Sequence, residues 1–78
     1  MNDIKDRVSR CFTNVFPDIR QEEIPLASPA SMGAWNSLAH IRLLSLIGEE
    51  FSLEPDMEDF EELTSYPAIL AWVEKKVS

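Results

Sequence analysis

The segment WNSLAHIRLLSLIGEEF, residues 35–51, decides the fold because it has the apolar spacing of a long helix. Its apolar residues recur every three or four positions, which places them on one helix face. The expected buried stripe consists of Leu38, Ile41, Leu44, Ile47 and Phe51, with Leu43 beside it. We expect the helix to begin at Asn36 or Ser37, since an asparagine oxygen can accept a backbone N–H of the first turn.

Similar spacing predicts a helix on either side of this segment. The first runs from about residue 2 to 16 and ends before Pro17, which disfavours helical geometry at the residue preceding it. Its inward face comprises Ile4, Val8, Cys11, Phe12 and Val15. The last helix runs from Ser65 or Tyr66 to about residue 77, and its inward face comprises Ile69, Trp72, Val73 and Val77.

Two shorter features complete the expected fold. A short helix should open at Asp56 and reach about Leu63, with Met57, Phe60 and Leu63 spaced three apart. Residues 17–36 contain three prolines and are predicted to form a long loop, which packs on the core through Ile24, Leu26 and Trp35. The sequence therefore predicts a single all-α domain over residues 1–78, a small bundle of three main helices plus one short helix, with a long loop between the first two.

Composition and charge exclude several classes of function. The 78 residues carry 14 acidic and 7 basic side chains, a net charge of −7, which is unsuited to nucleic acid or an anionic membrane and favours basic partners. One cysteine and one histidine exclude a disulfide framework and a self-contained zinc site. No apolar run approaches a membrane span and the N-terminus has no apolar core of a signal peptide, so we expect a cytoplasmic protein without membrane insertion. We also expect a monomer. Cys11 is expected to be a buried, inert thiol.

Ser37 is the candidate functional residue. A hydroxyl in the first turn of a helix lies beside unpaired backbone N–H groups, where the helix dipole favours a phosphate ester. The competing interpretation is a plain capping serine. His40 lies three residues further on, but a Ser–His catalytic pair would lack an orienting carboxylate and an oxyanion hole. We therefore expect no catalytic residues, and an exposed His40 beside a modification site.

The acidic residues between 54 and 62 admit two interpretations as well. They lack the ligand spacing and the glycine of a calcium-binding loop. They form either a solvated helix face or a docking patch for a basic partner.

These residues resemble a known family. The run from Trp35 to Ile41, followed by Leu43-Leu44 and Glu49-Glu50-Phe51, is similar to the attachment-site region of acyl carrier proteins, which carry Asp-Ser-Leu at the start of the second helix. The stretch Leu63 to Ile69 resembles the entry into that family's last helix. Length, acidity and helix order agree, so the resemblance covers essentially the whole chain.

The resemblance implies that a phosphopantetheinyl transferase moves 4′-phosphopantetheine from coenzyme A onto Ser37, flanked by the motif residues Asn36 and Leu38. An acyl- or aminoacyl-loading ligase and downstream acyl-processing enzymes would be the other partners. Their expected contact residues are His40, Ile41, Arg42, Glu49, Glu50, Asp56, Glu58 and Asp59. The alternative is a degenerate carrier fold that acts only as a protein-interaction module without the arm.

The sequence departs from the family pattern at three positions. Asn36 replaces the usual Asp, while Ala39 and Arg42 stand where acidic residues are common, which predicts a specialised stand-alone carrier with dedicated partners. For the cargo we expect a shallow pocket that suits short or polar groups. Its expected lining is Leu44, Ile47, Leu63, Ile69 and Trp72.

Overall fold

The expected helices are present in the computed structural model, which describes residues 3–77. They are α1 (Asp3–Val15), α2 (Ser37–Phe51), α3 (Met57–Glu62) and α4 (Tyr66–Val77), with a 3₁₀ helix, η1 (Gln21–Leu26), between α1 and α2. The described residues contain no strand, so the all-α prediction is confirmed. Residue 2, proposed as a helix start, lies outside the described part of the chain.

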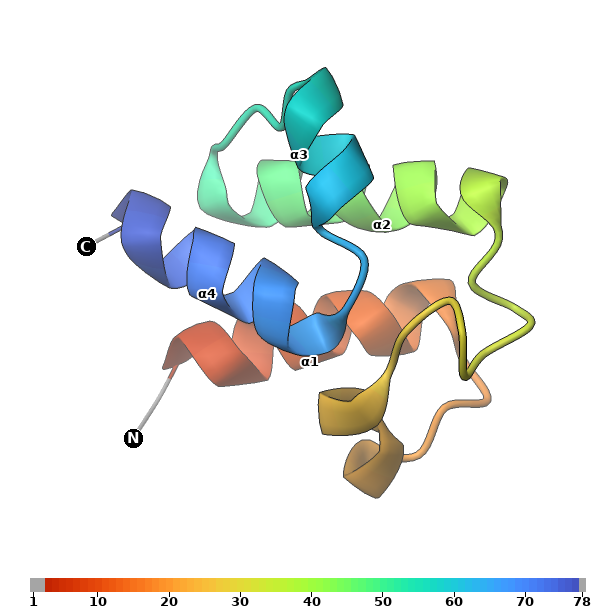
Figure 1. Ribbon diagram of the computed structural model, residues 1–78. Helices are drawn as coiled ribbons and strands as arrows, with labels where there is room; N and C mark the ends of the chain where they lie inside the picture. The colour runs from red at the N-terminus through yellow and green to blue at the C-terminus, as the bar shows by residue number, and fades with distance from the viewer. Residues whose placement is uncertain (1–2, 78) are drawn as a thin grey trace.

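The helices pack around α1 (Figure 1). Helices α1 and α2 lie side by side and run antiparallel, and α4 packs on α1, while the short α3 rests on α2. The core contains side chains from all the long helices and from the α1–α2 connection. Its largest fully buried members are Val8, Phe12, Ile24, Leu43, Leu44, Ile47, Ile69 and Val73.

The connection between α1 and α2 is more ordered than the sequence predicted, because η1 occupies its middle. Ile24 and Trp35 are buried as expected, but the prediction for Leu26 is wrong, since its side chain is 78% exposed. With three residues per turn, Ile24 and Ala27 share the inward side of η1, which leaves Leu26 pointing outward. The backbone N–H of Tyr66 also donates to the Ala27 carbonyl at 3.1 Å, which ties the connection to α4.

At α4 the predicted face is partly correct. Ile69 and Val73 are fully buried and Trp72 is half-buried, but Val77 is 41% exposed. Each step of four residues rotates a helix position by about 40°, so by Val77 the stripe has turned away from the core. The Ser65 hydroxyl caps the helix as expected, by accepting the N–H of Ala68 at 3.2 Å.

Gly48 allows the chain to fold back tightly after α2. The helix ends at Phe51, and the capping residue Ser52 adopts a left-handed conformation (φ 57°, ψ 46°). The N–H of Leu53 donates to the Gly48 carbonyl. A Cβ at residue 48 would lie 2.6 Å from the Leu53 carbonyl oxygen and 3.3 Å from Cδ of Pro55. The connection between α2 and α3 therefore approaches the backbone of α2 at Gly48 as closely as only glycine permits.

We expect Gly48→Ala to destabilise the protein by about 1–3 kcal/mol, because the clash is with backbone and exceeds the helix-propensity gain of alanine. Urea unfolding measures the change. Gly33→Ala is the matched control, since no atom lies within 4 Å of the added Cβ, and it should change stability by less than about 0.5 kcal/mol. Equal effects of the two substitutions would contradict the proposed contact.

Cys11 is buried, as expected, on the core side of α1. Burial raises the pKa of its thiol from 9.0 to about 11, with a further rise from the negative charge of Glu50 and an opposing effect of Arg7. The folded protein therefore holds the thiol proton at pH values where the unfolded chain releases it.

This difference predicts a loss of stability in alkali. The contribution of Cys11 is fully present below about pH 9 and is lost as the pH rises towards 11, at about 1.4 kcal/mol per pH unit. Urea unfolding at pH 8 and at pH 10.5 should therefore show a steeper decline for the wild type than for Cys11→Ala. Parallel declines would show that the thiol does not contribute.

Candidate functional site

The start of α2 is built by its capping residue. Asn36 has an extended backbone (φ −92°, ψ −175°), and its side-chain oxygen accepts the N–H of Ala39 at 2.9 Å. The first backbone hydrogen bond of the helix runs from His40 N–H to the Asn36 carbonyl, also at 2.9 Å. The prediction that Asn36 caps this helix is confirmed.

Ser37 occupies the first helical position, and its side chain is exposed. Within residues 3–77 its hydroxyl makes no hydrogen bond, and neither Ser37 nor Leu38 uses its backbone N–H in one. The first turn of α2 contains no acidic residue to offset the positive end of the helix dipole. An oxygen-bound phosphate at Ser37 would thus meet a favourable field and two available donors.

The side chain of His40 is not exposed as expected. It is half-buried; Nδ1 accepts the indole N–H of Trp35 at 3.0 Å, and Nε2 lies 2.6 Å from the Phe60 carbonyl oxygen. Both ring nitrogens are therefore occupied by residues other than Ser37. The predicted exposure of His40 is therefore wrong.

Two predicted members of the buried stripe of α2 are exposed. Leu38 is 67% and Ile41 is 52% exposed, while Leu43, Leu44 and Ile47 are buried. At about 100° per residue, Leu38 lies some 120° around the helix from Leu44. The helix face that packs against the core is therefore rotated away from Leu38. Met57 of α3 is also exposed, at 82%. The surface of the two helices therefore carries the apolar side chains of Leu38, Ile41 and Met57.

The acidic residues expected to contact partners have unequal roles. Asp56 and Asp59 form a capping box, each accepting the other's backbone N–H, so both stabilise the start of α3. Glu50 is joined to Arg7 of α1 by an ion pair of 2.6 Å. Glu49 and Glu58 are exposed and form no ion pair within the described residues. Arg42 is exposed as well.

The residues expected to line a cargo pocket are mostly buried in the core. Leu44, Ile47, Leu63 and Ile69 belong to one buried cluster, and the half-buried Trp72 packs against it. The indole N–H of Trp72 is buried and has no hydrogen-bond partner in the part of the chain that the structure describes.

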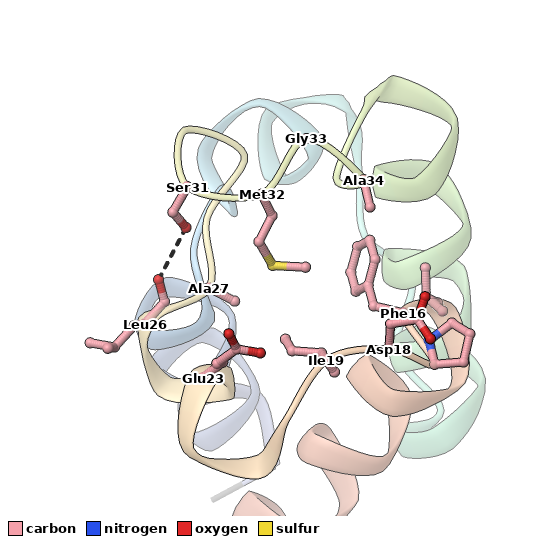
Figure 2. Close-up of a pocket in the computed structure, with 12 residues that line it drawn as sticks. Phe16, Asp18, Ile19, Glu23, Leu26, Ala27, Ser31, Met32, Gly33 and Ala34 are labelled. Atoms are coloured by element: carbon pink, nitrogen blue, oxygen red, sulfur yellow. Dashed lines mark hydrogen bonds between the residues drawn. The ribbon is translucent and has the colours of Figure 1, made fainter.

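A hollow of about 500 Å³ lies elsewhere, between the end of α1, η1 and the loop before α2. Figure 2 shows the Met32 thioether, the Phe16 ring and Ile19 around it. None of the five residues expected to line a cargo pocket takes part. The sequence analysis did not predict this hollow. Its only sign in the sequence is a set of apolar residues scattered through the loop.

Residues 3–77 contain no cluster of three or more side chains suited to hold a metal ion. Among the same residues, no helix is long and apolar enough to cross a membrane. Comparisons with family models, curated proteins and solved structures found no match.

Proposed function

We propose that this protein is a carrier that holds acyl or aminoacyl groups as thioesters on a 4′-phosphopantetheine arm attached to Ser37. The observation that carries the proposal is the exposed, unbonded hydroxyl of Ser37 at the first position of α2, where helix-end donors remain available. The resemblance of residues 35–51 to the attachment region of acyl carrier proteins supports the same function. The chain is proposed to work in the cytoplasm.

In the loading step, the Ser37 oxygen attacks the β-phosphorus of coenzyme A. A phosphodiester bond forms, the diphosphate bond breaks, and adenosine 3′,5′-bisphosphate leaves with the electron pair. The transferase takes up the hydroxyl proton. The thiol at the end of the arm is then acylated by a ligase and presented to downstream enzymes.

The proposed docking surface for these enzymes lies on α2 and α3, where the apolar side chains of Leu38, Ile41 and Met57 and the charged side chains of Arg42, Glu49 and Glu58 are exposed. Exposed apolar side chains beside charges are typical of protein-binding surfaces. The same exposed side chains also support the second candidate, an interaction module that carries no arm.

Intact mass distinguishes the two functions. The purified protein is incubated with coenzyme A and a broad-specificity phosphopantetheinyl transferase, and a carrier should gain the mass of one arm. An established carrier protein in the same reaction controls for the transferase. If that control is loaded while this chain stays unmodified, the interaction module is favoured.

Asn36 should limit the rate of loading by a generic transferase. Asn36→Asp keeps the cap and adds a charge, so we expect a few-fold faster modification, on the order of 1 kcal/mol. Asn36→Ser is the matched control, because it retains a capping oxygen without a charge and should not accelerate the reaction. An unchanged rate for Asn36→Asp at low and at high salt would contradict the proposed role of the charge.

A further inference from the structure

The hydrogen bonds of His40 define which ring nitrogen carries the proton. The indole N–H of Trp35 can only donate, so Nδ1 of His40 must accept at 3.0 Å. The Phe60 carbonyl oxygen can only accept, so Nε2, at 2.6 Å, must hold the hydrogen. The arrangement therefore requires a neutral imidazole in one tautomer.

The two partners of His40 belong to segments that position the candidate site. The ring of Trp35 is 3% exposed and lies against Phe12 and Phe16, and its backbone leads directly into the cap of α2. Phe60 belongs to α3, a six-residue helix that contains no buried residue of its own. His40 thus joins the segment before Ser37 to a helix that has no buried residue.

A second proton on His40 would break this connection. Nδ1–H would then face the indole N–H at 3.0 Å, and two donors cannot form a hydrogen bond. The buried indole N–H would lose its acceptor, which is costly. Imidazole is the side chain that ordinarily changes charge between pH 5 and 8.

The surroundings of the ring contain charges but no ion-pair partner. Helix α3 has the acidic residues Glu58, Asp59, Glu61 and Glu62, α2 has Arg42 two positions along, and residues 27–36 have no ionisable side chain. Across residues 3–77, none of these groups forms an ion pair with the ring. A protonated His40 would therefore lose the Trp35 bond without gaining a salt bridge in the present arrangement.

We propose that the Trp35–His40–Phe60 hydrogen bonds form a proton-sensitive latch, which couples the segment before Ser37 to α3 and opens when His40 is protonated. His40 is then a positioning residue for Ser37. This last consequence rests on the proposed function, whereas the latch itself does not.

Nuclear magnetic resonance tests the latch directly. The indole N–H signal of Trp35, assigned with Trp35→Phe, is followed from pH 8 to pH 5 together with the His40 ring signal. We expect the indole signal to move towards its unbonded position with the same midpoint as the His40 signal. An indole signal that does not move, or that titrates with a different midpoint, would overturn the latch.

His40→Gln provides a variant that cannot be protonated. Its amide offers one acceptor and one donor at a spacing similar to the ring nitrogens. The Trp35 signal of this variant should stay constant over the same pH range. A shift equal to that of the wild type would show that another group causes it, and so would overturn the proposal.

The effect on Ser37 is measured separately as the rate of phosphopantetheinylation, at constant pH 8 so that the transferase is unaffected. We expect His40→Ala to slow modification several-fold and His40→Gln to restore most of the rate. A wild-type rate for His40→Ala would overturn the positioning role. If even the wild type accepts no arm, the proposed function fails, while the magnetic resonance titration still decides the latch.

Discussion

Ser37→Ala is expected to abolish phosphopantetheinylation completely while leaving the fold intact. The phosphodiester requires the hydroxyl oxygen, and alanine offers none. The side chain is exposed and makes no hydrogen bond within residues 3–77, and Asn36 supplies the helix cap, so stability should change by less than about 0.5 kcal/mol. Intact mass after incubation with coenzyme A and transferase measures the modification, and circular dichroism measures the fold.

Ser45→Ala is the matched control, because Ser45 is also an exposed serine on α2 but lies two turns along the helix. This variant should accept the arm at the wild-type rate. Appearance of the arm on the Ser37→Ala protein would show that another residue is the acceptor.

Phe12→Ala is expected to have the largest effect on stability. Phe12 is completely buried, and its ring lies 5.5 Å from Trp35, 5.4 Å from Tyr66 and 6.3 Å from Phe16, measured between ring centroids. Truncation of such a residue costs about 3–5 kcal/mol through lost burial and the cavity left behind. That loss is comparable to the whole stability of a domain of this size.

Urea unfolding measures this loss, and Phe12→Leu should lose only part of it, which keeps the test usable if the alanine variant does not fold. Leu26→Ala serves as the control, because that side chain is 78% exposed and its removal should change stability by less than about 0.5 kcal/mol. A Phe12→Ala protein as stable as the Leu26→Ala protein would contradict the assignment of Phe12 to the centre of the core.

The helices of this protein follow from local sequence. Apolar spacing and capping residues act over three or four positions, so Asn36 and Ser65 marked helix starts correctly. Local sequence likewise placed Ser37 in the first turn of α2. The burial of Cys11 was also predictable, since it shares one face of α1 with four other apolar residues.

The rotation of α2 required the tertiary structure. Periodicity identified an apolar helix but not which of two overlapping stripes the core would accept, and packing against α1 selected the face of Leu44 and Ile47 over that of Leu38. As a result, residues expected in the core became a candidate docking surface. Stripes less than half a turn apart differ little in local energy, so the neighbouring helix decides between them.

The surroundings of the candidate site were also decided by contacts between distant residues. The bond from His40 to the Phe60 carbonyl spans 20 positions, and the ion pair from Arg7 to Glu50 spans 43. Local sequence determined where Ser37 sits on its helix, because capping and the helix dipole act within one turn. Only the packed structure determined that His40 turns inward. Its hydrogen-bond donor, Trp35, and its acceptor, the Phe60 carbonyl, belong to separate segments that meet when the core forms.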